Sequence, residues 1–324
     1  MYPLKLRFIA KSALWGGSRL KEAYGKACDL SPLSETWELS CRAAEDCLIE
    51  NGPAAGMTLG RYFEDYGARL VGRAYAEEDA ATRRFPLLIK FIDACDKLSV
   101  QVHPDDAYAA AHERDPGKTE LWYVVEAKPG ARLIYGLADG VTSADFEAAV
   151  REGRIGDVVR YVPVEKGQTW FIPSGMLHAI GEGILIAEIQ QNSDLTYRVY
   201  DYDRRGADGK TRPLHTEQAI AVTRPFSEEE VAAVRFDPAV CPLPYGEALA
   251  AGRYFRVSRL LLDGKQTVTV EEDSFLHLLC VEGEGEIVTD GDRYPITCGD
   301  SFFLPAGLGA VTLQGKATLL LSAV

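Results

Sequence analysis

The chain has 324 residues, of which 47% are hydrophobic and 26% charged, a balance that predicts a globular protein with about two domains. Its formal net charge of −13 disfavours binding to nucleic acid or to an anionic membrane, because both partners require a basic surface. The seven cysteines are scattered without a Cys-x-x-Cys pair, and no apolar run resembles a signal peptide or a membrane span. These features predict a cytoplasmic protein, in which an anionic substrate would need a local cluster of basic residues.

The N-terminal part combines predicted strands with one helical insertion. Alternating or continuous apolar runs predict strands at residues 4–9, 36–41 and 85–94. Apolar residues then recur at helical spacing from Leu59 to Leu70, after a break that contains glycine and proline. A helical insertion is therefore expected over about residues 57–84.

Beyond residue 100, strand patterns predominate. Further strands are expected at residues 121–125, 131–137, 158–164, 169–174, 183–190 and 195–202. Short helices are expected at residues 105–114, 143–152 and 228–234. Residues 223–247 contain several prolines and indicate a connecting segment. Residues 248–324 indicate short strands separated by turns such as Asp263-Gly264 and Asp290-Gly291, a pattern typical of a small sandwich or barrel.

The stretch from Leu98 to Asp106, LSVQVHPDD, is the part of the sequence most suggestive of chemistry. If it forms a strand, Ser99, Gln101 and His103 share one face, because side chains alternate along a strand. Lys118 and Glu120 also stand two residues apart, at the head of the next predicted strand. An amide oxygen, an imidazole and a carboxylate are then available to a metal ion, and His178 is the candidate for a second imidazole.

An internal repeat links the two halves of the chain. Gly167, Pro173, Gly175 and His178 form the frame Gly-x5-Pro-x-Gly-x2-His, and the same frame recurs from Gly299 with alanine in place of the histidine. Upstream, EAKPGARLI at Glu126 matches EGEGEIV at Glu282, and this alignment makes Leu276 the counterpart of Glu120 in the second copy. The repeat predicts two related barrels, of which the first alone has metal ligands.

The glycine–proline–histidine frame resembles the second motif of cupins, small antiparallel barrels that hold a metal. The set LSVQVHPDD, GKTELWYV, PSGMLHAI and AEIQQNSDLTYRVYDYDR is narrower, and it resembles class I mannose-6-phosphate isomerases of the short bacterial form over nearly the whole chain. The resemblance implies a mainly β fold of two cupin, jelly-roll-like antiparallel barrels with an inserted helical segment. It divides the chain into a catalytic domain at 1–222, a connecting segment at 223–247 and a second, degenerate domain at 248–324.

The same resemblance implies a role for particular residues. The zinc ligands of the family fall on Gln101, His103, Glu120 and His178. Its active-site arginine, lysine and acidic residue fall on Arg198, Lys118 and Glu188. One departure from the general cupin pattern is Gln-x-His in place of His-x-His, and it is a departure that the isomerase family shares.

The chemistry of these residues agrees with a metal-dependent aldose-ketose isomerase. The resemblance implies a small phosphorylated sugar as its substrate, and a monomer or homodimer is expected. Nitrogen and oxygen donors suit one Zn²⁺ per chain best, with Mn²⁺ or Fe²⁺ as alternatives. Glu188, expected among apolar groups, is a candidate for the base that moves the proton, although Lys118 or a metal-bound water could do so. Two other classes stay open at this point: another metal cupin enzyme acting on sugars, such as an epimerase or oxygenase, and a sugar-binding cupin without catalysis.

Overall fold

Strands predominate in the computed structural model, which describes residues 1–80, 83–206 and 208–324. Residues 81 and 82, at the end of the expected helical insertion, lie outside this description. The strands of the described residues form three larger sheets and one small hairpin, and their ladders do not close into a barrel. The mainly β class predicted from the sequence is confirmed, with separate sheets in place of closed barrels.

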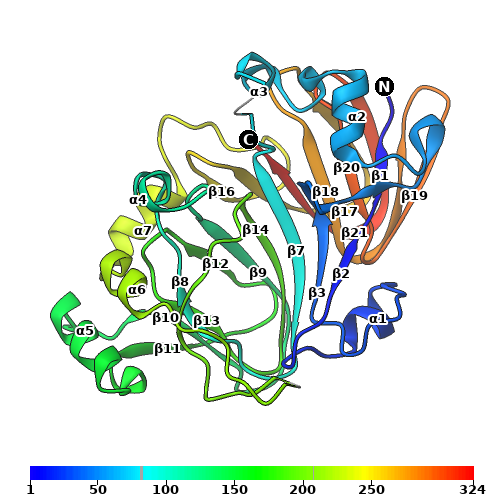
Figure 1. Ribbon diagram of the computed structural model, residues 1–324. Coiled ribbons are helices and arrows are strands. Elements are labelled where there is room, and N and C mark those ends of the chain that lie inside the picture. The colour runs from blue at the N-terminus through cyan, green and yellow to red at the C-terminus, as the bar shows by residue number, and fades with distance from the viewer. Residues whose placement is uncertain (81–82, 207) are drawn as a thin grey trace.

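Two of the sheets face each other in the N-terminal two thirds of the chain (Figure 1). The five-stranded sheet has the order β11 (Val159–Pro163), β10 (Arg132–Leu137), β13 (His178–Ile180), β8 (Val100–Val102) and β15 (Tyr197–Tyr200). The six-stranded sheet has the order β12 (Thr169–Ile172), β9 (Glu120–Ala127), β14 (Ile184–Gln191), β7 (Leu87–Ala94), β3 (Glu35–Leu39) and β2 (Ile9–Lys11). All neighbouring pairs in both sheets are antiparallel.

Apolar side chains from the two sheets meet in the space between them. Trp122 and Ile186 of the six-stranded sheet belong to the same buried cluster as Leu133 and Ile180 of the five-stranded sheet. On β8, Val100 and Val102 point the other way, into a cluster with residues of α5 (Ser143–Arg151) and α6 (Thr216–Val222). The predicted alternation of Val100 and Val102 with Gln101 is therefore observed on β8, and its polar face is turned toward the space between the sheets. Leu98, which was expected on the same face as the two valines, instead lies in the apolar cluster between the sheets.

The third sheet contains most of the C-terminal region and two strands from the N-terminus. Its order is β16 (Glu247–Ala251), β17 (Arg256–Val270), β21 (Gly309–Ala323), β18 (Leu276–Val288), β20 (Ser301–Leu304), β1 (Leu4–Arg7) and β6 (Leu48–Ile49), and β19 (Arg293–Thr297) pairs with β18. Leu4 of β1 lies opposite Phe303 of β20, so the first strand of the chain joins a sheet formed mainly by C-terminal strands. The division at residues 222 and 247 stays a prediction.

The strands of the C-terminal region are longer than the sequence predicts. β17 continues through Asp263-Gly264, which was expected to be a turn, and pairs with β21 along its whole length. Gly264 and Gly315 face each other with φ of +100° and +140°, so two glycines accommodate the irregular backbone without breaking the ladder. The turn expected at Asp290-Gly291 is confirmed, between β18 and β19.

Helices surround the sheets rather than form a separate domain. They are α1 (Arg19–Ala23), α2 (Leu59–Tyr66), α3 (Arg73–Glu77), α4 (Asp106–His112), α5, α6 and α7 (Glu228–Arg235), with single 3-10 turns at Gly52–Ala54, Ala68–Leu70 and Ile155–Asp157. The hairpin is β4 (Cys41–Arg42) and β5 (Glu45–Asp46). In the expected insertion, α2 begins after Thr58, whose side chain accepts a hydrogen bond from the Arg61 N–H, and buries Leu59, Tyr62 and Phe63. α1 and α6 were not predicted.

Strand register confirms the internal repeat. Ile172 of β12 lies opposite Glu120 of β9, and Leu304 of β20, five residues after Gly299 as Ile172 is after Gly167, lies opposite Leu276 of β18. Aligning the two copies of the repeat matches these same positions, so the two halves of the chain share one strand arrangement. None of the described helices is long and apolar enough to cross a bilayer.

Candidate metal centre and active site

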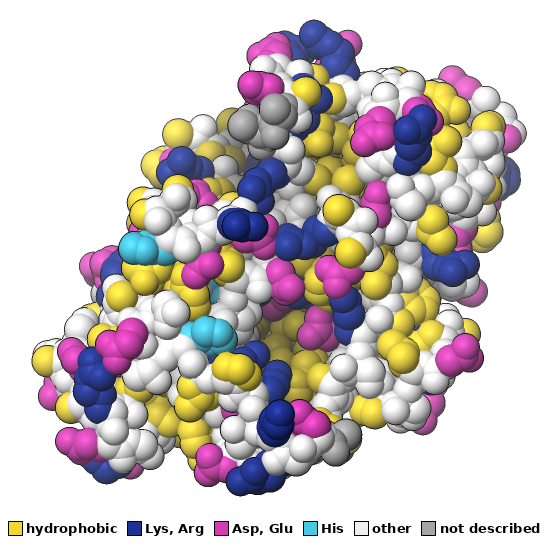
Figure 2. Space-filling model, viewed as in Figure 1, with side chains coloured by type: hydrophobic (Ala, Val, Ile, Leu, Met, Phe, Trp, Pro, Cys, Tyr) yellow, Lys and Arg dark blue, Asp and Glu magenta, His cyan; other side chains and the backbone are white. Residues whose placement is uncertain are grey.

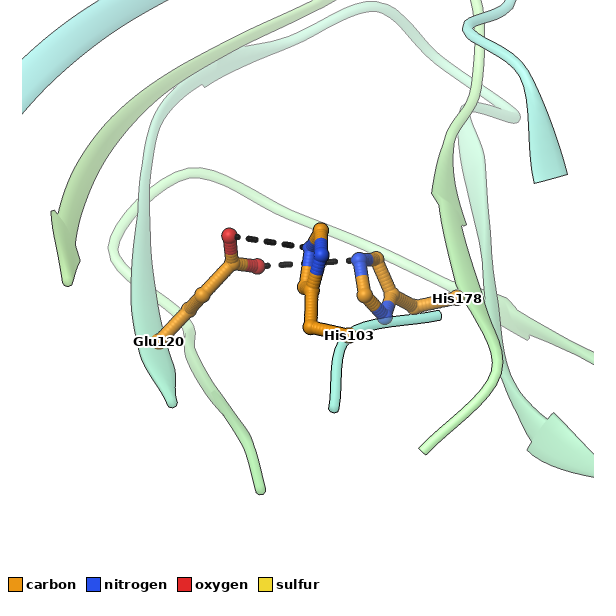
Figure 3. Close-up of side chains that lie close together, drawn as sticks. All are labelled: His103, Glu120 and His178. Atoms are coloured by element: carbon orange, nitrogen blue, oxygen red, sulfur yellow. Dashed lines mark ion pairs between the residues drawn. The ribbon is translucent and has the colours of Figure 1, made fainter. Parts of the chain in front are cut away.

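Three predicted ligands come together between the facing sheets (Figure 3). Nε2 of His103 lies 3.3 Å from Oε1 of Glu120, and Nε2 of His178 lies 3.6 Å from Oε2. The two imidazole rings have their centroids 4.8 Å apart, and all three side chains are buried. His103 follows β8, Glu120 begins β9 and His178 begins β13, so strand ends from both sheets supply the cluster.

The hydrogen bonds of the two histidines leave one nitrogen of each directed at the cluster. Nδ1 of His103 lies 2.7 Å from the carbonyl oxygen of Leu195, and Nδ1 of His178 lies 2.8 Å from that of Met176. These carbonyls require Nδ1–H as the donor, so each Nε2 carries a lone pair. The Nε2 atoms of the two histidines and Oε2 of Glu120 have no hydrogen-bond partner among the described residues. Buried, unpartnered acceptors that face one another are the arrangement a divalent cation requires.

Protonation favours the same interpretation. Burial, followed by the nearby Lys118 ammonium, lowers the pKa of His103 to about 3, and burial also lowers the pKa of His178. For Glu120, burial acts in the opposite direction but is outweighed by Lys118 and His103, which hold its pKa well below the usual range. Two neutral imidazoles and one carboxylate are thus present at neutral pH.

Gln101, the fourth predicted ligand, stands beside this cluster. Its backbone lies opposite His178 in the pairing of β8 with β13, and opposite Arg198 in the pairing of β8 with β15. Residues directly opposite in a sheet project to the same face, so the amide of Gln101 and the imidazole of His178 share a side. Gln101 also lines a cavity beside the cluster.

A cavity of about 270 Å³ adjoins the cluster and opens to solvent. Gln101, Lys118, Glu188 and Arg198 all line it, so it brings one predicted ligand together with all three predicted catalytic residues. The remaining lining includes loop residues Ser12, Ala13 and Trp15, strand residues of β3 and β7, and Arg212. Figure 2 shows the molecular face hollowed in this part of the structure, with apolar surface inside and charged side chains around it.

Lys118 is buried and does not lie in a solvated loop. Its Nζ lies 2.6 Å from Oε1 of Glu120, and its side chain is 5% exposed. The backbone N–H of Lys118 donates to the carbonyl of Pro104, 3.0 Å away, which ties it to the segment after His103. The lysine therefore offers a positive charge at the boundary between the ligand cluster and the cavity.

Glu188 lies on β14 with its carboxylate held from two sides. Nε1 of Trp122 donates a hydrogen bond of 2.7 Å to Oε2, and Nζ of Lys90 lies 3.5 Å from Oε1. Burial, followed by the charge of Glu120, raises the pKa of Glu188. Neither Trp122 nor Lys90 was singled out from the sequence as a partner of Glu188. The signal for Lys90 was a lone cation within the apolar run 85–94, which β7 buries completely.

Arg198 is not occupied by the acidic residues near it in sequence. Asp201 instead accepts hydrogen bonds of 2.7 Å from both Arg204 and Arg212. Arg198 donates from one guanidinium nitrogen to the carbonyl of Pro213, at 2.9 Å, and pairs with no carboxylate in the described part of the chain. Burial, followed by the charge of Arg212, lowers its pKa. A guanidinium without an acidic partner is available to an anionic ligand.

Comparisons with known proteins place this site in a family. Residues 3–128 match the phosphomannose isomerase type I catalytic domain, and residues 247–324 match the mannose-6-phosphate isomerase cupin domain. Two Bacillus subtilis proteins, the mannose-6-phosphate isomerase ManA and the probable mannose-6-phosphate isomerase GmuF, are each 36% identical to this chain. Both matches cover 99% of this chain, and they span 98% of ManA and 99% of GmuF. The chain belongs to the class I mannose-6-phosphate isomerase family.

Solved structures agree with this assignment. The crystal structure of mannose 6-phosphate isomerase from Bacillus subtilis has a TM-score of 0.87, with 30% identity and complete coverage of both chains. That of a putative mannosephosphate isomerase from Archaeoglobus fulgidus has a TM-score of 0.74 at 19% identity, covering 99% of this chain and 96% of its own, and so shows the shared fold. The activity of this class I isomerase is that of a phosphomannose isomerase, and no finding favours the epimerase, oxygenase or binding alternatives.

The C-terminal region of this class I isomerase lacks the ligand set. Leu276 and Leu304, which correspond to Glu120 and Ile172, belong to a buried apolar cluster, and Ala310 stands where the first copy has His178. His277 points to the other side of the sheet, where its Nε2 lies 2.9 Å from Oγ of Ser301. The asymmetry predicted by the repeat is thus seen in side-chain packing.

Proposed function

We propose that Gln101, His103, Glu120 and His178 bind one divalent cation, and that mannose 6-phosphate and fructose 6-phosphate interconvert in the adjoining cavity. The observation that carries the proposal is the convergence of two neutral imidazole nitrogens and a buried carboxylate. Two nitrogens with oxygens and no thiolate suit Zn²⁺, which we propose as the native ion. Mn²⁺ and Fe²⁺ are its rivals, because an amide oxygen is a weak donor that does not select strongly for zinc.

The reaction moves a carbon-bound proton from C2 of the aldose to C1 and the hydroxyl proton of O2 to O1, through an enediolate whose negative charge must be stabilised. A bound divalent cation supplies positive charge to the substrate oxygens on which that negative charge develops. Lys118 can donate a hydrogen bond to a substrate oxygen from the wall that the cavity shares with Glu120. Its buried position supports this role, because a charge acts more strongly where water is excluded.

Glu188 is our candidate for the base that carries the proton between C2 and C1. Trp122 engages Oε2, so Oε1 is the oxygen left to accept the proton, with Lys90 beside it to compensate the charge. Its raised pKa makes it a stronger base than an exposed carboxylate. Lys118 is the alternative, since its side chain also lines the cavity.

Arg198 is our candidate for binding the substrate phosphate. A guanidinium can bind two phosphate oxygens at once, and no carboxylate of the described chain neutralises this one. Arg212 lines the same cavity but is held by Asp201, so it can add charge without being the primary ligand. This local excess of arginines supplies the positive potential that an acidic protein needs to attract an anion.

Metal analysis combined with a coupled assay tests the proposal. We expect purified protein to contain about one zinc per chain and to produce fructose 6-phosphate from mannose 6-phosphate. Chelation should abolish turnover, and returning zinc should restore it. His103→Ala and His178→Ala should lose metal and activity together. Full turnover after complete removal of metal would refute the metal centre.

Composition supports the remaining expectations. The seven cysteines are all free thiols, which supports location in a reducing compartment such as the cytoplasm. The net charge of −13 supports the absence of nucleic-acid binding. We propose that the protein acts as a monomer or homodimer, which light scattering of the purified protein would test.

A further inference from the structure

The turn between β16 and β17 contacts the metal-centre half of the molecule through Tyr254. This residue belongs to the region that matches the cupin domain, yet its hydroxyl donates a hydrogen bond of 2.8 Å to Oδ2 of Asp106. Asp106 is the first residue of α4 and stands three positions after His103. Burial, followed by the hydrogen bond to Asp106, raises the pKa of Tyr254 to about 12, so the hydroxyl keeps its proton and stays a donor.

The other oxygen of Asp106 holds the segment that leads into β9. Oδ1 accepts a hydrogen bond of 3.0 Å from the backbone N–H of Gly117 and another of 3.1 Å from Nε2 of Gln191. Oε1 of Gln191 in turn accepts from the backbone N–H of Thr119, at 2.9 Å. A single carboxylate thus connects the C-terminal region, the segment before β9 and the end of β14.

Close packing transmits any displacement of α4 to this segment. A Cβ on Gly117 would lie 2.5 Å from backbone atoms of Asp105 and Asp106, so the segment lies directly against the start of the helix. The next residue, Lys118, donates its backbone N–H to the carbonyl of Pro104. A shift of α4 would therefore move the lysine that lines the cavity and, two residues later, the ligand carboxylate.

We infer that Tyr254 is a positioning residue for the metal centre, acting through Asp106 on Lys118 and Glu120. The inference rests on the proposed ligand role of Glu120 and gives the C-terminal region, which lacks the ligand set, a part in the reaction. Tyr254→Phe keeps the ring and removes only the hydroxyl, so Asp106 loses one of its three donors.

The test compares Tyr254→Phe with Tyr245→Phe as a matched control. Tyr245 accepts a hydrogen bond of 2.8 Å from the Thr269 N–H and donates one of 3.3 Å to the Thr269 carbonyl, so its hydroxyl bonds to β17 and not to the metal-centre half. Both variants are measured for zinc affinity, by competition with a chromophoric chelator, and for kcat and KM at saturating zinc. The affinity readout does not depend on turnover.

We expect Tyr254→Phe to lower zinc affinity and kcat by about tenfold each, with KM changed less than about twofold, because contacts outside the ligand shell orient the ligands. Tyr245→Phe should match the parent. Asp106→Asn with Tyr254→Phe should be no worse than Asp106→Asn alone, because both changes interrupt one connection. Equal zinc affinity and kcat in the two tyrosine variants would overturn the inference, whereas a parent that binds no zinc would refute the metal centre itself.

Discussion

Changing Glu120 and Glu188 to glutamine, one at a time, should distinguish a ligand carboxylate from a proton-transferring one. Oxygens of Glu120 lie 3.3 and 3.6 Å from the two imidazole nitrogens. With an effective dielectric constant of about 20, a unit negative charge attracts each unit of positive charge about 4 Å away by about 4 kcal/mol, so losing the charge of Glu120 weakens attraction to a divalent cation by at least about 4 kcal/mol. That difference is roughly a thousandfold in affinity. Glu120→Gln should therefore lose zinc at concentrations that saturate the parent.

Glu188→Gln should keep its zinc, because Glu188 contacts Trp122 and Lys90 rather than the imidazole nitrogens. A glutamine oxygen can still accept the hydrogen bond from Trp122, and Lys90 keeps Glu35 at 3.9 Å as an acidic partner, so the fold should be preserved. It cannot accept the C2 proton, and we expect exchange of that proton with solvent deuterium to slow by about a hundredfold or more. Substrate affinity should stay near that of the parent.

Three measurements on the same samples decide the assignment: bound zinc after dialysis, mannose 6-phosphate affinity, and C2–deuterium exchange followed by NMR. Exchange at the parent rate in Glu188→Gln would exclude Glu188 as the base, and Lys118 would be the next residue to change. Undiminished zinc affinity in Glu120→Gln would refute the ligand assignment, whatever the effect on turnover.

Three further changes test separate features. Arg198→Ala should reduce kcat/KM for mannose 6-phosphate at least about a hundredfold more than for free mannose, if it binds phosphate; equal losses would reassign it to transition-state stabilisation. Lys90→Met should lower the free energy of unfolding by about 3 kcal/mol, since it removes the cation that lies 3.5 Å from the buried Glu188 carboxylate. In urea titrations that loss should shrink as the pH falls and Glu188 takes a proton; a loss of the same size at every pH would contradict this account. Burial, followed by the charge of Lys26, lowers the pKa of His277 to about 3. Between about pH 6.5 and 3 only the unfolded chain binds this proton, so the protein becomes less stable as the pH falls through that window. His277→Gln should flatten the slope of Tm against pH in that window, and parallel curves would contradict it.

The sequence predicted the parts of the fold that obey a simple period. Alternation on the 98–106 stretch placed Val100 and Val102 on one face and Gln101 on the other, as the clusters around β8 require. The repeat frame predicted that Leu276 corresponds to Glu120, and strand register confirms it. Both features are local or recurrent, so the sequence alone contains them.

Features that depend on distant partners were not predictable in this way. Asp263-Gly264 has the composition of a turn, but the facing glycine on β21 lets the strand continue, and that pairing is tertiary. Trp122 is buried, and its indole N–H donates a hydrogen bond to Glu188, a contact that needs β9 beside β14. Lys90 similarly acquires meaning only when β14 lies beside β7.

The pairing of Leu4 with Phe303 has a consequence for biosynthesis. At ribosomal rates of about 5–20 residues per second, β1 has to wait tens of seconds or longer for β20 to emerge. Until then it presents an unpaired edge, and the site for β1 on the C-terminal sheet is likewise open in any fragment that starts at β16. Nascent chains of this enzyme should therefore depend on chaperones until late in translation. Peptides with the sequence of β1 should bind in trans to a fragment that starts at β16.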